Sequence, residues 1–201
     1  MTVLNEIKIG VVIIPMQFEE YENYKKFKKI INEKNILYKE VVAGDKINIE
    51  EGLDFEVLWP TLDKAIKENS INNNSLVCKM RYKNISALFT GDIEEIAEKE
   101  ILKKYVTEPS KLNANILKVA HHGSKSSSIS EFIEKVNPQL ALIGVGKENS
   151  FGHPSEKTLK TLENSNTKIY RTDISGEICI KYTKKGKIKT KEKVRWRYGK
   201  R

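Results

Sequence analysis

Apolar residues recur along the chain in two alternating spacings. The spacing of Tyr21, Tyr24, Phe27, Ile30 and Ile31, with lysines between them, predicts an amphipathic helix over residues 19–35. Compact apolar runs predict strands at 7–15, 36–42, 53–58, 75–82, 86–90, 116–120, 140–145, 169–171 and 177–182. Helical spacing returns at 93–105, 128–136 and 155–164. This order predicts an α/β (α+β) fold with a mixed sheet, or two sheets with helices outside.

Local signals mark several boundaries between these elements. Lys83-Asn84 separates two predicted strands and indicates a hairpin. Ala43-Gly44-Asp45 indicates a turn, and Ser155 stands where it can cap the helix over 155–164. Residues 63–74 are polar and rich in asparagine, which predicts a loop with at most a short helix.

Composition narrows the class of protein. With 201 residues, 39% of them apolar and 31% charged, the chain is long enough to bury a core and suits one globular domain. No apolar run approaches the roughly 20 residues of a membrane span, and no secretory signal precedes 9–16. The sequence alone therefore predicts a soluble, cytoplasmic chain.

The positive charge lies at the carboxyl end. The 36 basic residues exceed the 27 acidic ones by nine, and residues 184–201 carry this excess. Such a tail can bind nucleic-acid phosphates and stack on bases. The candidate residues for this are Lys185, Lys187, Lys189, Arg195, Trp196 and Arg197. The alternative is an edge hairpin whose lysines alternate along one face and prevent aggregation.

Candidate chemistry gathers where predicted strands end. All three histidines lie between 121 and 153: His121 and His122 follow one strand, and His153 lies in the loop before a helix. Imidazole is a common zinc ligand, and loops at strand ends can bring distant residues together. Asp92 ends another strand in Thr90-Gly91-Asp92. Its side chain is interpreted as a metal ligand or, alternatively, as the cap of the next helix.

Five motifs in order identify a family resemblance. They are Asn73 to Val77, Leu88 to Asp92, Leu117 to Ser124, Asn149 to Pro154, and Tyr170 to Gly176. Together they resemble the carboxyl-terminal metallo-β-lactamase-like domain of the competence protein ComEC and of stand-alone hydrolases similar to it. The resemblance covers about residues 7–182 and implies an αββα sandwich with metal ions at the sheet edges.

The resemblance also implies roles for individual residues. It assigns metal ligation to Asp92, His121 and His153, with His122 as the second choice in the His-His-Gly-Ser motif, and makes Asp92 and His121 the candidate catalytic residues. It implies that Asn74, Ser124, Asn149 and Thr172 line the substrate pocket. The implied metal is Zn²⁺ or Mn²⁺, and the implied substrate is DNA or a nucleotide. A metal-bound water could then attack a phosphodiester.

One part of the family pattern is missing. The relatives carry an HxHxDH-type motif in their amino-terminal half, whereas this chain has no histidine before His121. We therefore expect residues 1–183 to form an incomplete metallo-β-lactamase-like domain that holds at most one ion, followed by the basic strand or tail at 184–201. A catalytic zinc uses about three protein ligands and a water, so such a chain should be inactive or weakly active.

Three functional hypotheses follow. The chain is a phosphodiesterase or nuclease linked to DNA uptake, a non-catalytic domain that binds nucleic acid through its tail, or a folded fragment without activity. An incomplete sandwich exposes an unpaired edge, through which the chain could form a homodimer. As part of a complete ComEC-like protein, the chain would be associated with a membrane.

Overall fold

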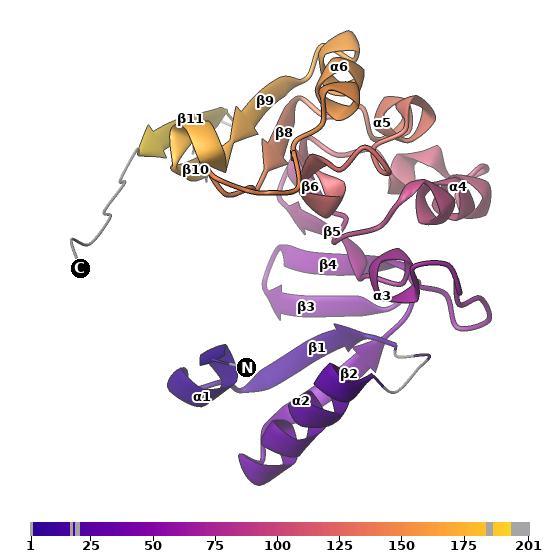
Figure 1. Cartoon of the computed structure of the whole chain (residues 1–201), viewed down its shortest axis with the longest axis vertical. Coiled ribbons are helices and arrows are strands. Elements are labelled where there is room, and N and C mark those ends of the chain that lie inside the picture. Colours follow the sequence, from indigo (N-terminus) through magenta and orange to yellow (C-terminus); the bar gives the residue numbers. More distant parts are fainter. Residues whose placement is uncertain (1, 17, 19–20, 184–186, 194–201) are drawn as a thin grey trace.

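The computed structural model of the chain describes residues 2–16, 18, 21–183 and 187–193. A small amino-terminal unit comes first and lies beyond one edge of the main sheet (Figure 1). Its elements are α1 (Thr2–Glu6), β1 (Val11–Pro15), α2 (Glu22–Glu33) and β2 (Leu37–Val41). β1 and β2 pair in parallel, which the crossover through α2 makes possible.

A seven-stranded mixed sheet forms the body of the molecule. Its strands, in spatial order, are β3 (Lys46–Glu50), β4 (Leu53–Trp59), β5 (Val77–Tyr82), β6 (Ile85–Phe89), β7 (Ile116–Lys118), β8 (Leu140–Ile143) and β9 (Lys168–Arg171). The pairs from β3 to β6 are antiparallel, and those from β6 to β9 are parallel. The predicted mixed α/β class is therefore confirmed.

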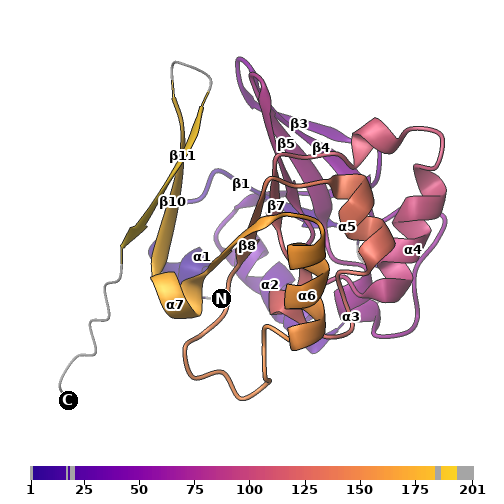
Figure 2. The ribbon, with the colours of Figure 1, turned by 90° about the horizontal axis from the view of Figure 1, so that it is seen from above.

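The helices that connect the parallel strands cover one face of the sheet. They are α4 (Glu95–Lys104), α5 (Ser130–Val136) and α6 (Glu156–Asn164), and Figure 2 shows them together on that side. The larger core fills the space between them and the sheet, where Leu88, Ile101, Leu117, Phe132 and Leu162 are almost fully buried. This packing fixes the positions of the loops that follow β6, β7 and β8.

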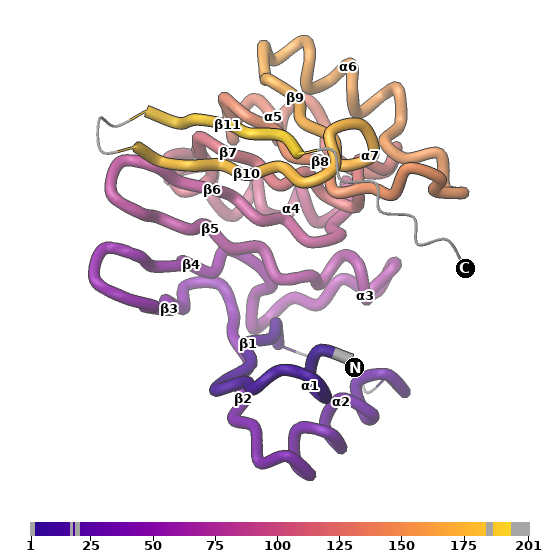
Figure 3. The backbone as a smooth tube through the Cα atoms, turned by 90° about the vertical axis from the view of Figure 1, so that its left-hand side faces the viewer, coloured from indigo at the N-terminus to yellow at the C-terminus, as the bar shows by residue number. Residues whose placement is uncertain are grey.

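A long hairpin lies over part of the opposite face. β10 (Glu177–Tyr182) and β11 (Ile188–Lys193) pair antiparallel and run beside the parallel strands (Figures 2 and 3). Ile178, Ile180 and Ile188 pack on a second apolar cluster under the hairpin. Lys187, which directly precedes β11, and Lys189 and Lys191 within it are exposed, as the edge-hairpin interpretation predicted. Lys185, Arg195, Trp196 and Arg197 lie outside the described residues.

Most predicted elements are present, with shifted ends. The hairpin at Lys83-Asn84 joins β5 and β6, and the Ser155 hydroxyl accepts a hydrogen bond from the Thr158 amide as the cap of α6. The short elements α3 (Ser70–Asn73), η1 (Pro109–Lys111), η2 (Ala120–Gly123) and α7 (Thr172–Ser175) complete the chain. Strand β3 was not predicted; it forms the edge of the sheet beside β4. Within the described ranges, no helix has the length and apolar character that crossing a bilayer requires.

Candidate functional site

Three loops meet at the carboxyl ends of the parallel strands. They follow the adjacent parallel strands β6, β7 and β8, whose carboxyl ends lie together. The first loop carries Asp92, the second carries His121 and His122, and the third carries His153. The topology therefore brings the predicted ligands from distant parts of the sequence to one place.

Backbone hydrogen bonds hold the three loops against one another. The His121 amide donates to the Gly91 carbonyl at 3.1 Å, and the Ser155 amide donates to the Gly123 carbonyl at 2.8 Å. Gly123 has φ +81°, and a Cβ atom there would stand 2.6 Å from the Pro154 Cβ. Only glycine fits a left-handed position with so close an approach.

Asp92 is not the cap of the following helix. Helix α4 begins at Glu95, and its N-cap position is Glu94, whose side chain makes no capping bond. The Asp92 amide donates to Ser75 Oγ at 3.2 Å, and the Asp92 carboxylate is 45% exposed. The alternative interpretation of Asp92 as a cap is therefore wrong, and its carboxylate is free to face the neighbouring loops.

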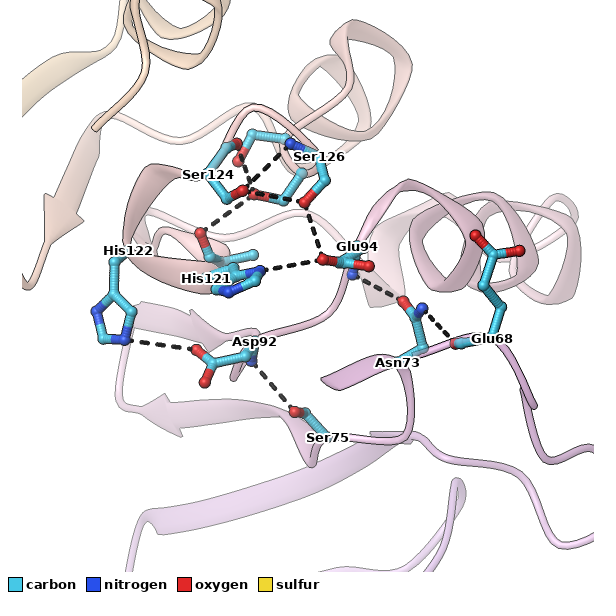
Figure 4. Close-up of polar contacts among 12 residues, drawn as sticks. Glu68, Asn73, Ser75, Asp92, Glu94, His121, His122, Ser124 and Ser126 are labelled. Atoms are coloured by element: carbon cyan, nitrogen blue, oxygen red, sulfur yellow. Dashed lines mark hydrogen bonds and ion pairs between the residues drawn. The ribbon is translucent and has the colours of Figure 1, made fainter. Parts of the chain in front are cut away.

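His122 is the histidine that approaches Asp92. Its Nδ1 lies 2.5 Å from the Gly144 carbonyl oxygen, and because a carbonyl only accepts, Nδ1 carries the proton. In the neutral ring, Nε2 then keeps a lone pair and lies 3.9 Å from Asp92 Oδ1 (Figure 4). Two electron-rich atoms at this spacing suit two ligands of one cation, which stand at most about 4.2 Å apart for bonds of ~2.1 Å.

His121 faces a different carboxylate. Its Nδ1 lies 3.3 Å from Glu94 Oε1, which accepts a hydrogen bond from Ser126 Oγ at 2.9 Å (Figure 4). The His121–Glu94 contact is an ion-pair distance without hydrogen-bond geometry, so this buried Nδ1 lacks a hydrogen-bond partner among the described residues. The structure thus pairs the first-choice histidine with Glu94 and the second-choice histidine with Asp92.

His153 stands beside His121. Their ring centroids are 5.7 Å apart and the rings meet edge to face. Burial lowers the pKa of His153, and the nearby His121 and His122 lower it further. The His153 ring is therefore held in its neutral form over a wider pH range than a free imidazole.

The backbone of the histidine pair is strained. His121 has φ 45° and ψ 43°, and His122 has φ 56° and ψ 21°. Two consecutive residues other than glycine in the left-handed region are uncommon, and such strain clusters at functional sites. The conformation turns the two imidazoles toward different partners, Asp92 and Glu94.

The four residues expected to line a pocket hold the backbone of the loops. Asn74 exchanges hydrogen bonds with the Ile66 backbone, and Asn149 does so with that of His153. Thr172 Oγ1 accepts from the Val145 amide and donates to the Val145 carbonyl, and Ser124 Oγ accepts from the Ser126 amide at 3.3 Å. Of the four, Asn74 also lines a cavity of about 640 Å³. That cavity reaches Asp92 from the side of the amino-terminal unit.

Two charged residues of the site were missed by sequence reasoning. Glu94 lies at the start of α4, where an acidic residue ordinarily indicates only a favourable helix end. Lys118 donates from Nζ to the Val119 carbonyl at 3.0 Å; burial lowers its pKa, and the charge of Asp92 raises it. In the sequence, Lys118 lies in a short predicted strand before the two histidines, and nothing in that position indicated that it would lie near Asp92.

The donor set fits a weak site for one ion better than a complete metal centre. Within the described ranges, no three His, Cys, Asp or Glu side chains converge as a ready cluster. Asp92 and His122 could supply two ligands, and the carbonyl bond at Nδ1 is the kind of outer contact that orients ligating histidines. Water or a phosphate oxygen would complete such a site.

Comparison of the sequence with known proteins shows which family the chain belongs to. No family model matches the chain. It is 35% identical over 179 residues to ComE operon protein 3 of Bacillus subtilis, covering 89% of this chain and 22% of that protein. It is 32% identical over 128 residues to competence protein ComA of Neisseria gonorrhoeae, covering 64% of this chain and 18% of that protein. The chain spans about a fifth of the length of these relatives. It belongs to the ComEC-like competence protein family.

Proposed function

We propose that this chain is part of a metal-dependent hydrolase that cleaves phosphodiester bonds of DNA during DNA uptake. The observation that carries the proposal is the Asp92–His122 pair, in which a carboxylate and an oriented imidazole stand 3.9 Å apart at a strained turn. The competence names of the relatives support the substrate class. In this proposal, the mixed sheet and its helices are the corresponding part of a metallo-β-lactamase-like sandwich.

Asp92 and His122 would hold one Zn²⁺ or Mn²⁺ ion. When bound, such an ion lowers the pKa of a water ligand and polarises a phosphate oxygen. The chain's own residues supply the other functions. The Lys118 ammonium near Asp92 would stabilise the negative charge of the phosphate. The Glu94 carboxylate lies 3.3 Å from His121 Nδ1 and would orient the imidazole electrostatically. His121 Nε2 is then available to exchange a proton with the leaving oxygen.

A cleavage assay tests this function. We expect the chain to cut a labelled single-stranded oligonucleotide slowly with Mn²⁺ or Zn²⁺ and not in EDTA, because two protein ligands fall short of the ~3 of catalytic zinc sites. Asp92→Asn should lower the rate by about 100-fold or more, the size of effect seen on losing a key electrostatic group. The exposed Asp63 gives a matched control, Asp63→Asn, which should cut as the unaltered chain does.

Two results would contradict the hydrolase. Cleavage that persists in EDTA would exclude metal-dependent chemistry at this site. Failure of a longer chain, in which the missing HxHxDH-type motif is restored, to cleave any phosphodiester with either metal would also contradict it.

A second candidate function is binding of nucleic acid without catalysis. The exposed Lys187, Lys189 and Lys191 support it, since they share one face of β11 while Ile188 packs inward. Replacing all three lysines by glutamine should weaken binding of single-stranded DNA in EDTA. The slope of log K against log salt should fall by about 2, since each lost phosphate contact contributes about 0.7.

A charge-matched variant controls for total charge. Lys8, Lys26 and Lys135 are exposed elsewhere on the chain, so their triple replacement by glutamine removes the same charge without touching β11. An equal change of slope in both triple variants would assign the effect to net charge and contradict a binding face on the hairpin.

A further inference from the structure

One aromatic side chain near the site is exposed without a structural reason. Phe151 lies in the loop between β8 and α6, which projects from the edge of the molecule in Figure 2. It is 80% exposed, more than any other large apolar side chain within the described ranges. Single exposed apolar side chains are common, so the surroundings of Phe151 and not its exposure alone decide whether the position is significant.

Hydrogen bonds fix the conformation of this loop. The Asn149 carboxamide accepts from the His153 amide at 2.9 Å and donates to the carbonyls of His153 and Gly146 at 2.8 and 3.1 Å. The Ser155 amide then ties the end of the loop to Gly123. Phe151 is therefore presented by a closed loop that is anchored on both sides.

The exposed Phe151 ring is linked to the candidate site through the ring of His153. Phe151 stacks on His153 with 5.9 Å between centroids and 18° between planes. His153 in turn meets His121 edge to face at 5.7 Å. The Phe151 ring lies roughly parallel to the His153 imidazole and still keeps most of its surface exposed, so it offers a flat apolar surface two rings away from His121.

We propose that Phe151 is a stacking platform for one base of a single-stranded nucleic acid whose backbone runs to the Asp92–His122 pair. The inference rests on the proposed function, because it takes the phosphodiester at that pair as the ligand. Aromatic side chains beside a backbone-binding groove hold unpaired bases in this way, and each stacked base contributes about 1–3 kcal/mol whatever its sequence. A duplex, whose bases are already stacked on one another, offers no free base for the platform.

Binding measured in EDTA tests the platform separately from catalysis. Fluorescence anisotropy of a labelled single-stranded oligonucleotide should show that Phe151→Ala weakens binding by about 10-fold with the salt slope unchanged. Phe151→Trp should restore the affinity, and the emission of the new tryptophan should be quenched by the oligonucleotide. Val106 is 73% exposed beyond α4, and Val106→Ala is the matched control that should bind normally.

An abasic oligonucleotide of the same length sharpens the test. It keeps the phosphates and removes the bases, so the unaltered chain and Phe151→Ala should bind it equally. A difference that persists on the abasic strand would overturn the stacking role, and so would unchanged binding in Phe151→Ala or no binding of single strands at all. If the affinity and quenching results hold while no metal supports cleavage, the hydrolase fails and the platform stands as a binding element alone.

Discussion

His122→Ala is expected to lower the affinity of the chain for Zn²⁺ by about 100-fold or more, whereas His121→Ala lowers it by about 10-fold or less. The reason is geometric: His122 Nε2 faces Asp92, while His121 faces Glu94. Loss of a direct ligand should exceed the 10–100-fold typical of outer-shell changes. Isothermal titration with Zn²⁺, together with metal content measured by plasma mass spectrometry, compares the two variants directly.

A second substitution at position 122 controls for the strained backbone of this residue. The variant is His122→Asn. Asparagine tolerates the left-handed backbone at this position and removes the imidazole, which separates ligation from strain. A larger loss in His121→Ala than in both His122 variants would show that the metal uses the other histidine.

Glu98→Ala is expected to destabilise the fold by about 3 kcal/mol or more at low pH. The Glu98 carboxylate is fully buried and accepts hydrogen bonds from the amides of Ser128 and Ile129 at 2.6 and 2.9 Å. Removing it leaves two buried donors without a partner, each a loss of roughly 1–3 kcal/mol. Urea unfolding followed by tryptophan fluorescence measures the change, and Glu134→Ala, at an exposed position of α5, is the matched control.

Glu98 also makes stability depend on pH. Burial raises the pKa of Glu98 from 4.5 to about 7, and the two amide bonds oppose this only in part. Between these pH values the folded chain keeps the proton that the unfolded chain releases. The contribution of Glu98 to the free energy of unfolding therefore falls by about 3 kcal/mol as pH rises from about 4.5 to 7. This decline should be absent in Glu98→Gln, and an equal decline in that variant would contradict the assignment.

The sequence was sufficient to predict most of the strands and helices because their apolar spacing reflects burial on the observed faces. Strand β3 escaped prediction since its residues are mostly exposed, and an edge strand needs only one neighbour. The pattern also placed Asp92 and the histidines at strand ends. The structure brings these ends together because the strands are parallel neighbours.

The contacts between side chains at these strand ends could not be predicted from the sequence. Whether His121 or His122 meets Asp92 depends on the left-handed dihedrals of both residues and on the carbonyl of Gly144, which is 22 positions away. Asn149 and Thr172 were expected to face a ligand but bond to backbone groups of the loops. The family resemblance implied that they line the pocket, but it did not indicate which atoms they contact.

The two left-handed histidines also bear on how this turn can evolve. Selection for folding alone would favour glycine or asparagine at 121 and 122, because these residues enter that backbone region at lower energy than histidine. Branched residues such as valine would be excluded altogether. The two imidazoles are therefore held at a cost in backbone energy that glycine or asparagine at these positions would lower.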